Sequence, residues 1–252
     1  MATGWVWNST HDDARMPSRA FLDVDVDDHR AKHARCRAFV EATDLRYGWS
    51  SKDVSALGGS EKSRLNEMYE SDHEWSARGA IETEPATKTR MVFELFDERA
   101  PLACENFKML CLGTRGTSKE SGARMCYEGV RFHRCVRGFM MQGGDFQHQN
   151  GAGGESALGK KTFKDDVGGL KLKHDARGVL SMGNTGKNSN TSQFFITFGP
   201  CKQLDGKHVV FGKIIEGMEV LDMIEEECAV APGGMSEEPT KSVVVAECGV
   251  LE

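Results

Sequence analysis

The stretch from Val130 to Phe146, VRFHRCVRGFMMQGGDF, constrains the fold of this 252-residue chain more than any other segment. It contains two apolar segments of strand length, interrupted by cationic side chains, and it closes on a polar glycine turn at Gln142–Asp145. The pattern predicts two neighbouring strands of a barrel or sheet wall that carry a fixed guanidinium. By itself it also fits an edge hairpin with solvated arginines, and the downstream segments distinguish the two.

Two further blocks follow in order. The first is GVLSMGNTGKNSNTSQFFITF, from Gly178 to Phe198, and the second is LDGKHVVFGKIIEGMEVLDMI, from Leu204 to Ile224. Together with FHR and GFMMQGGDF in the first stretch, these blocks closely resemble the cyclophilins, the peptidyl-prolyl isomerases that bind cyclosporin. The resemblance runs from about residue 90 to the C-terminus, with a first strand further upstream. Several blocks in the family's order and spacing are more specific than one short motif.

The resemblance implies a mainly β fold, a closed eight-stranded antiparallel barrel capped by two helices. Strand-length segments occur at about 20–27, 90–97, 130–135, 138–142, 179–183, 193–198, 208–215 and 241–248. Pro101 and Gly113 bracket one predicted helix, and a second runs from about Met218 to Glu227. Because side chains fill the interior of an eight-stranded barrel, we expect no ligand cavity inside it.

The first two predicted strands are about sixty residues apart, where cyclophilins have a short hairpin. We expect residues 1–18 to form an N-terminal tail and residues 19–252 a cyclophilin-like domain, interrupted by a largely helical insertion at about 29–88. Within the insertion, one helix is predicted to end at Gly48 and another to run from Ser60 to Trp75.

Charge is unevenly distributed around this insertion. The first strand alternates apolar residues with three aspartates that we expect to face solvent: Asp23, Asp25 and Asp27. The first helix of the insertion is basic, with Arg30, Lys32, Arg35, Arg37 and Arg46. We favour packing of this helix on the acidic strand over the alternative, a docking face for an acidic partner.

The resemblance assigns site residues position by position. It implies a peptidyl-prolyl cis-trans isomerase that acts non-covalently on X-Pro bonds, with Arg134 donating to the imide nitrogen and Gln142 orienting it, and that assists protein folding. The implied catalytic residues are Arg134, Phe139, Gln142, Asn184 and His208. The implied substrate-binding residues are Met140, Gly183, Thr185, Gln193, Phe195, Gln203 and Leu204.

Three positions depart from the family pattern. Gln203 stands where many cyclophilins carry Trp, Arg137 where a proline is common, and Thr185 is bulkier than the usual Ala. An indole offers an N–H and a large apolar face to cyclosporin, whereas a glutamine offers less apolar area and a more flexible chain. We therefore expect cyclosporin binding to be weakened, while every implied catalytic group is present.

The loop between Cys111 and Phe132 is extended and resembles that of the divergent-loop cyclophilins. Those proteins combine the loop with a glutamate after the glycine turn and two cysteines, which Glu155, Cys111 and Cys248 match. The resemblance implies a candidate redox switch. The alternative is that both cysteines are small buried hydrophobes, which is common for free cysteine and which a reducing compartment favours.

Composition restricts the remaining classes. A net charge of −6 argues against general nucleic-acid binding, and no apolar run approaches the length of a membrane span. The N-terminus lacks the basic and apolar regions of a signal peptide. Eight scattered cysteines without a CxxC pair suit reduced thiols in the cytoplasm rather than a disulfide framework or a zinc site. We expect a monomer without metal or cofactor, and the resemblance implies proline-containing peptides and client proteins as partners.

Two other functions remain open at this point. The chain can be a proline-peptide binding module in which turnover is incidental, or a scaffold whose function lies in the insertion. The presence of Arg134, Phe139, Gln142 and His208 argues against the first. A comparison of binding partners with and without residues 29–88 addresses the second.

Overall fold

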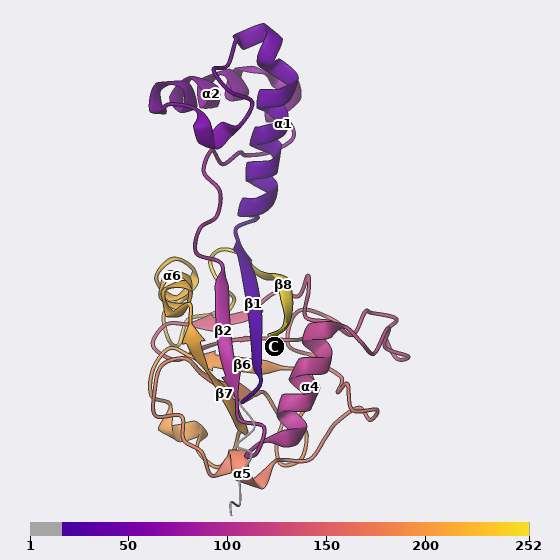
Figure 1. Cartoon of the computed structure of the whole chain (residues 1–252). Coiled ribbons are helices and arrows are strands. Elements are labelled where there is room, and N and C mark those ends of the chain that lie inside the picture. Colours follow the sequence, from indigo (N-terminus) through magenta and orange to yellow (C-terminus); the bar gives the residue numbers. More distant parts are fainter. Residues whose placement is uncertain (1–16, 252) are drawn as a thin grey trace, which may run out of the picture.

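The computed structural model describes residues 17–251, and its centre is one antiparallel sheet (Figure 1). Within these residues the sheet has eight strands in the order β3-β4-β6-β5-β7-β2-β1-β8. The strands are β1 (Arg19–Val26), β2 (Arg90–Leu95), β3 (Arg134–Val136), β4 (Met140–Gly143), β5 (Val179–Met182), β6 (Phe194–Thr197), β7 (Val210–Glu216) and β8 (Val243–Leu251). All eight overlap the predicted strand segments, so the mainly β, antiparallel prediction is confirmed.

The sheet curls into a half-barrel and does not close, so the predicted closed barrel is wrong. β3 and β8 are the two ends of the strand order. The chain before β3 changes partner within two residues, because Phe132 N–H donates to Val243 O of β8 while His133 N–H donates to Gln142 O of β4. The predicted strand at 130–135 is therefore divided, and a single bridge, Arg131 to Val244, joins this segment to β8.

Two helices pack against the sheet, as the sequence predicted. They are α4 (Pro101–Leu112), with proline in its first turn and Gly113 in the left-handed conformation after it, and α6 (Met218–Cys228). The buried Phe107 of α4 lies at the centre of the barrel core, with ring centroids 5.3 Å from those of Phe194 and Phe211. Two short helical elements, α5 (Val167–Leu170) and η2 (Lys202–Leu204), lie in the connections.

The chain between β1 and β2 forms a separate helical lobe beyond the end of β1 (Figure 1). Its elements are α1 (His29–Tyr47), η1 (Val54–Ala56), α2 (Gly59–Ser71) and α3 (His73–Ser76). The lobe has its own hydrophobic core, built from Cys36, Phe39, Val40, Trp49, Val54, Leu57, Leu65 and Tyr69. This core does not share residues with the barrel core, so the two parts bury their apolar side chains independently.

The helix ends in the lobe match the sequence prediction only in part. α1 ends at Gly48, in the left-handed conformation (φ +61°), as predicted. The single helix predicted from Ser60 to Trp75 is instead two helices, because the Asp72 carboxylate accepts hydrogen bonds from the N–H groups of Glu74 and Trp75 and caps α3 as a new helix.

The prediction that Asp23, Asp25 and Asp27 all face solvent is wrong for Asp23. Asp23 is buried and forms a two-pronged ion pair with Arg90, which is its register partner on β2, with both N–O distances 2.8 Å. Asp25 accepts from the N–H of Arg30, and Asp27 pairs with Lys32 at 2.7 Å. The ion pair and hydrogen bond between α1 and the acidic strand thus lie at the first turn of α1.

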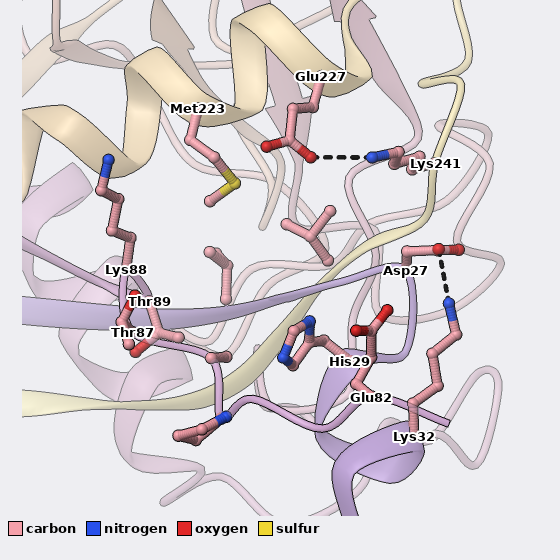
Figure 2. A pocket seen from close by; sticks show the side chains of 14 residues that line it. Asp27, His29, Lys32, Glu82, Thr87, Lys88, Thr89, Met223, Glu227 and Lys241 are labelled. Atoms are coloured by element: carbon pink, nitrogen blue, oxygen red, sulfur yellow. Dashed lines mark hydrogen bonds and ion pairs between the residues drawn. The ribbon is translucent and has the colours of Figure 1, made fainter. Parts of the chain in front are cut away.

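A cavity of about 390 Å³ lies where the lobe meets the barrel (Figure 2). The lobe contributes His29, Lys32 and Glu82 to its wall, and the barrel contributes Met223, Glu227 and Lys241 among others. Of the two ion pairs drawn on its wall, Lys32–Asp27 joins α1 of the lobe to the end of β1, whereas Lys241–Glu227 lies within the barrel. The junction is thus a thin contact.

Neither a membrane helix nor a metal cluster is present in the described part of the chain. Within residues 17–251, no helix combines the length and apolarity needed to cross a bilayer. Across the same residues, no group of three or more His, Cys, Asp or Glu side chains is arranged to hold a metal ion. The N-terminal tail predicted for residues 1–18 lies almost entirely outside the described residues.

Candidate active site

The candidate site lies on the outward face of β3, β4 and β6. Successive residues of a strand point to opposite faces of the sheet. Met141, Phe194 and Ile196 lie in the barrel core, so Met140, Gln142 and Phe195 take the outward face. The register places Gln142 opposite both Arg134 on β3 and Phe195 on β6. A tight hairpin between β3 and β4 and a long-range pairing of β4 with β6 thus bring Arg134 and Phe195 onto the same face.

The guanidinium of Arg134 is fixed on this face. Its carbon lies 5.5 Å from the centre of the Phe139 ring. Its Nε and Nη2 donate to the two carboxylate oxygens of Glu237, at 2.6 and 3.1 Å. These hydrogen bonds lower the pKa of the Glu237 carboxyl, so the pair is ionic at neutral pH. Glu237 was not predicted from the sequence, because it lies 103 residues from Arg134 and belongs to no motif.

Gln142 lies beside Arg134, but its side-chain amide contacts another residue. It donates to Oε1 of Gln193 at 2.8 Å. Gln193 in turn donates to the carbonyls of Gly151 and Gly153, at 2.9 and 2.7 Å. A chain of amide hydrogen bonds therefore connects β4 to the glycine-rich turn, while Glu237 is the side chain that accepts from the guanidinium.

Aromatic side chains form the next part of the site. Phe195 is only 2% exposed, and its ring stacks on His174 and meets His208 edge-on, with centroids 5.7 and 5.3 Å away. His208 Nδ1 lies 2.9 Å from the Met182 carbonyl, which fixes that nitrogen as the donor. Burial lowers the pKa of His208, so the ring is neutral near pH 7 with Nε2 as an acceptor. The backbone N–H of His208 donates to the carbonyl of Leu204 at 3.3 Å.

The remaining predicted site residues follow β5 or lie on η2. Asn184 Nδ2 donates to the Lys207 carbonyl, and a cavity of about 540 Å³ opens between Asn184, Leu170 and His208. Thr185 is exposed, and the N–H of Gly183 donates to Gln193 O at 2.9 Å. Gln203 is exposed on η2.

The predicted redox residues border the extended loop. Cys248 Sγ on β8 donates to the Cys111 carbonyl at 3.3 Å, and hydrogen bonding with the Cys111 side chain raises the pKa of Cys248 to about 12. A third cysteine, Cys126 in the loop, also hydrogen-bonds with Cys248, which raises the Cys126 pKa. Glu155 accepts from the loop's Ser118 at 2.5 Å. The structure thus brings together Cys111, Cys248 and Cys126, of which the last was not foreseen.

Comparisons with known proteins agree with this geometry. The family model "Cyclophilin type peptidyl-prolyl cis-trans isomerase/CLD" matches residues 80–250. Peptidyl-prolyl cis-trans isomerase cyp11 of Rhizopus delemar is 47% identical over 162 residues, which are 64% of this chain and 46% of that protein. NK-tumor recognition protein, of Mus musculus and of Homo sapiens, is 48% identical over 162 residues but only 11% of its length is covered.

The chain therefore spans less than half the length of these relatives, and the family match begins at residue 80, after most of the helical lobe. The match covers all of the strands from β2 to β7 and most of β8. By sequence and by architecture, this chain belongs to the cyclophilin-type peptidyl-prolyl cis-trans isomerase family.

Proposed function

We propose that this protein is a peptidyl-prolyl cis-trans isomerase that acts on X-Pro bonds of peptides and proteins without a covalent intermediate. The observation that carries the proposal is the position of Arg134, whose guanidinium is held over Phe139 on the same outward face as Phe195 and Gln142. A cation beside an apolar aromatic surface is what a proline-containing substrate needs at its twisted imide bond.

The mechanism follows from the free-energy barrier to rotation about the X-Pro bond. Rotation about a peptide bond crosses about 18–20 kcal/mol, because the nitrogen lone pair is delocalised into the carbonyl. Uncatalysed rotation at proline takes roughly tens to hundreds of seconds. Reaching milliseconds requires a factor of about 10⁵, or roughly 7 kcal/mol. A guanidinium N–H aimed at the imide nitrogen localises that lone pair and stabilises the twisted state more than either planar state.

The other residues of the site then bind and orient the peptide. Phe139, Met140, Phe195, Leu204 and His208 hold the proline ring, and the backbone of Asn184 receives the peptide chain. Gln142 and Gln193 hold the substrate against the wall of the site through the amide chain that ends on Gly151 and Gly153. Gly183 and Thr185 flank Asn184, which lines the shallow hollow.

The clients are proline-containing peptides and folding proteins, and the protein acts as a monomer in the cytoplasm. The scattered cysteines without a CxxC pair support the reducing compartment. Cyclosporin is a weak ligand, because the exposed Gln203 supplies less apolar area than the tryptophan at that position in many cyclophilins.

Arg134→Ala tests the proposed mechanism. We expect kcat/KM for a short X-Pro peptide to fall by roughly 10²–10³-fold with the fold intact. Cis/trans exchange measured by NMR, with circular dichroism as the check on folding, gives the result. Near wild-type exchange in a folded variant contradicts the mechanism, and the absence of exchange in the wild type favours the binding-module alternative.

The same site is proposed to respond to oxidation through Cys111 and Cys248. The contact of Cys248 with the Cys111 backbone supports the proximity of the two residues. A peroxide would oxidise the two thiols to a disulfide, and itself be reduced to water, and the resulting strain would reach the Arg134 strand through the loop that Glu155 holds.

Peroxide treatment of the wild type and of Cys248→Ser, with non-reducing peptide mapping, tests this switch. We expect reversible loss of activity in the wild type alone. Equal losses in both proteins, or no peptide joining Cys111 to Cys248, would show that these cysteines serve only packing.

A further inference from the structure

The segment between α6 and β8 runs along the free edge of β3. β3 is an end strand of the sheet, so one of its edges lacks a strand partner. Backbone hydrogen bonds from this segment occupy that edge. The N–H of Val230 donates to Cys135 O at 3.0 Å, and the N–H of Cys135 donates to Glu237 O at 2.8 Å. The backbone of Glu237 is thus fastened to the residue next to Arg134.

The side chain of Glu237 returns to the same strand. Its two oxygens accept from Nε and Nη2 of Arg134, at 2.6 and 3.1 Å, in the forked geometry that a guanidinium and a carboxylate share. Glu237 is therefore held to β3 at two points, through its carbonyl and through its carboxylate. A carboxylate fixed in this way restricts the rotation of the guanidinium.

The pairing leaves the catalytic part of the guanidinium available. A guanidinium carries five N–H bonds, and Glu237 accepts two of them, so three remain, two of them on Nη1. The guanidinium carbon is already 5.5 Å from the centre of Phe139 while this pair is formed. Glu237 thus occupies one edge of the group without moving it away from the proposed proline pocket.

We propose that Glu237 is the positioning residue of the isomerase site: it holds the Arg134 guanidinium so that its remaining N–H bonds face the imide nitrogen. This inference rests on the proposed function. Glu237, in the segment between α6 and β8, orients Arg134, while the Gln142 amide is hydrogen-bonded to Gln193. A positioned donor lowers the barrier more than one that must be ordered in each turnover.

The neighbouring carboxylate provides a matched control. Glu238 lies one residue further along and contacts Arg131, at 3.5 Å, on the exposed surface. Glu238→Gln removes the same charge from the same segment without touching Arg134. The backbone bond from Cys135 to the Glu237 carbonyl uses no side-chain atom, so it can persist in every variant at position 237.

Steady-state exchange kinetics on a short X-Pro peptide test the proposal. For Glu237→Ala we expect kcat to fall roughly 5–20-fold with KM within about twofold, because the lost contact orients the transition-state donor more than it binds substrate. Glu237→Gln, which keeps one acceptor for the fork, should lose less. Glu238→Gln should stay within about twofold of the wild type.

A double-mutant cycle separates positioning from a structural effect. In an Arg134→Ala background, Glu237→Ala should cause no further loss, since no guanidinium remains to be oriented. Additive losses, a rise in KM alone, or an activity increase in Glu237→Ala would overturn the proposal. If Arg134→Ala itself retains full activity, the proposed mechanism fails; if only the Glu237 variants retain it, this inference alone fails.

Discussion

The barrel and the helical lobe each fold around a hydrophobic core, but only the barrel holds residues of the candidate site. Each has its own hydrophobic core, one centred on Phe107 and the other on Phe39. Every residue of the candidate site belongs to the barrel, and the lobe joins it through two chain crossings and a thin, cavity-bearing junction. An insertion that buries its own apolar side chains can be accommodated in a hairpin without disturbing the strands that position the site.

The basic residues of the lobe do not pair with the buried carboxylate of the barrel. The aspartate of β1 with the greatest burial, Asp23, takes its partner from β2 rather than from the basic α1 helix. The pairs that α1 makes with β1 and its end are at the exposed first turn. Exposed pairs contribute about 0–1 kcal/mol each, so the two parts are weakly coupled.

The largest expected effects come from removing one buried ring from each of the two cores. Phe107→Ala and Phe39→Ala each remove a fully buried ring, at a cost of about 3–5 kcal/mol to the part that contains it. Phe107→Ala should lower the temperature at which isomerase activity is lost. Phe39→Ala should shift the fluorescence transition of Trp49 and Trp75, which belong to the lobe, and leave activity unchanged.

Thermal melts followed by tryptophan fluorescence and by residual activity provide the measurement for both variants. A single transition that both probes report, shifted equally by the two substitutions, would show that the cores unfold together.

Cyclosporin binding gives a second comparison of the barrel and the lobe, because we expect this ligand to contact only the barrel. We expect Gln203→Trp to tighten cyclosporin binding at least about tenfold, or about 1.4 kcal/mol, because the indole adds apolar area and a donor on η2. Titration calorimetry measures the change. The same substitution in a chain without the lobe should give the same gain, and no gain in either protein would show that position 203 does not limit affinity.

Removing the lobe should have the smallest effect on catalysis. Replacing residues 29–88 by a short turn retains the β1–β2 register, which pairs Asp23 with Arg90. We expect kcat/KM on short peptides to stay within about twofold, with a measurable decrease in melting temperature from the lost first-turn pairs. Exchange kinetics on the two proteins measure the change in kcat/KM, and calorimetry measures the change in melting temperature.

An unchanged melting temperature would contradict packing of α1 on the first strand and would strengthen the alternative that its basic residues dock an acidic partner. A tenfold loss of activity would mean that the lobe influences the candidate site through the junction.

The sequence by itself determined the elements and most of the candidate site. A period-two pattern marked the first strand, the other strand-length segments fitted the fold that the resemblance implies, and Pro101, Gly113 and Gly48 marked helix ends, because these signals depend on residues a few positions apart. The ordered blocks brought Arg134, Phe139, Gln142, Phe195 and His208 to attention, and the structure places Arg134 over Phe139, Gln142 opposite Arg134 and Phe195, and Phe195 against His208.

Only the tertiary structure decided the contacts that depend on register and on distant loops. Local patterns do not show that Asp23 lies opposite Arg90, that the chain changes partner at Phe132 and leaves the barrel open, or that Cys126 joins Cys111 and Cys248. The same holds for Glu237, which reaches Arg134 across 103 residues because a connecting segment pairs with the free edge of β3. Such contacts follow from where the whole sheet places its edges, which no short stretch of sequence specifies.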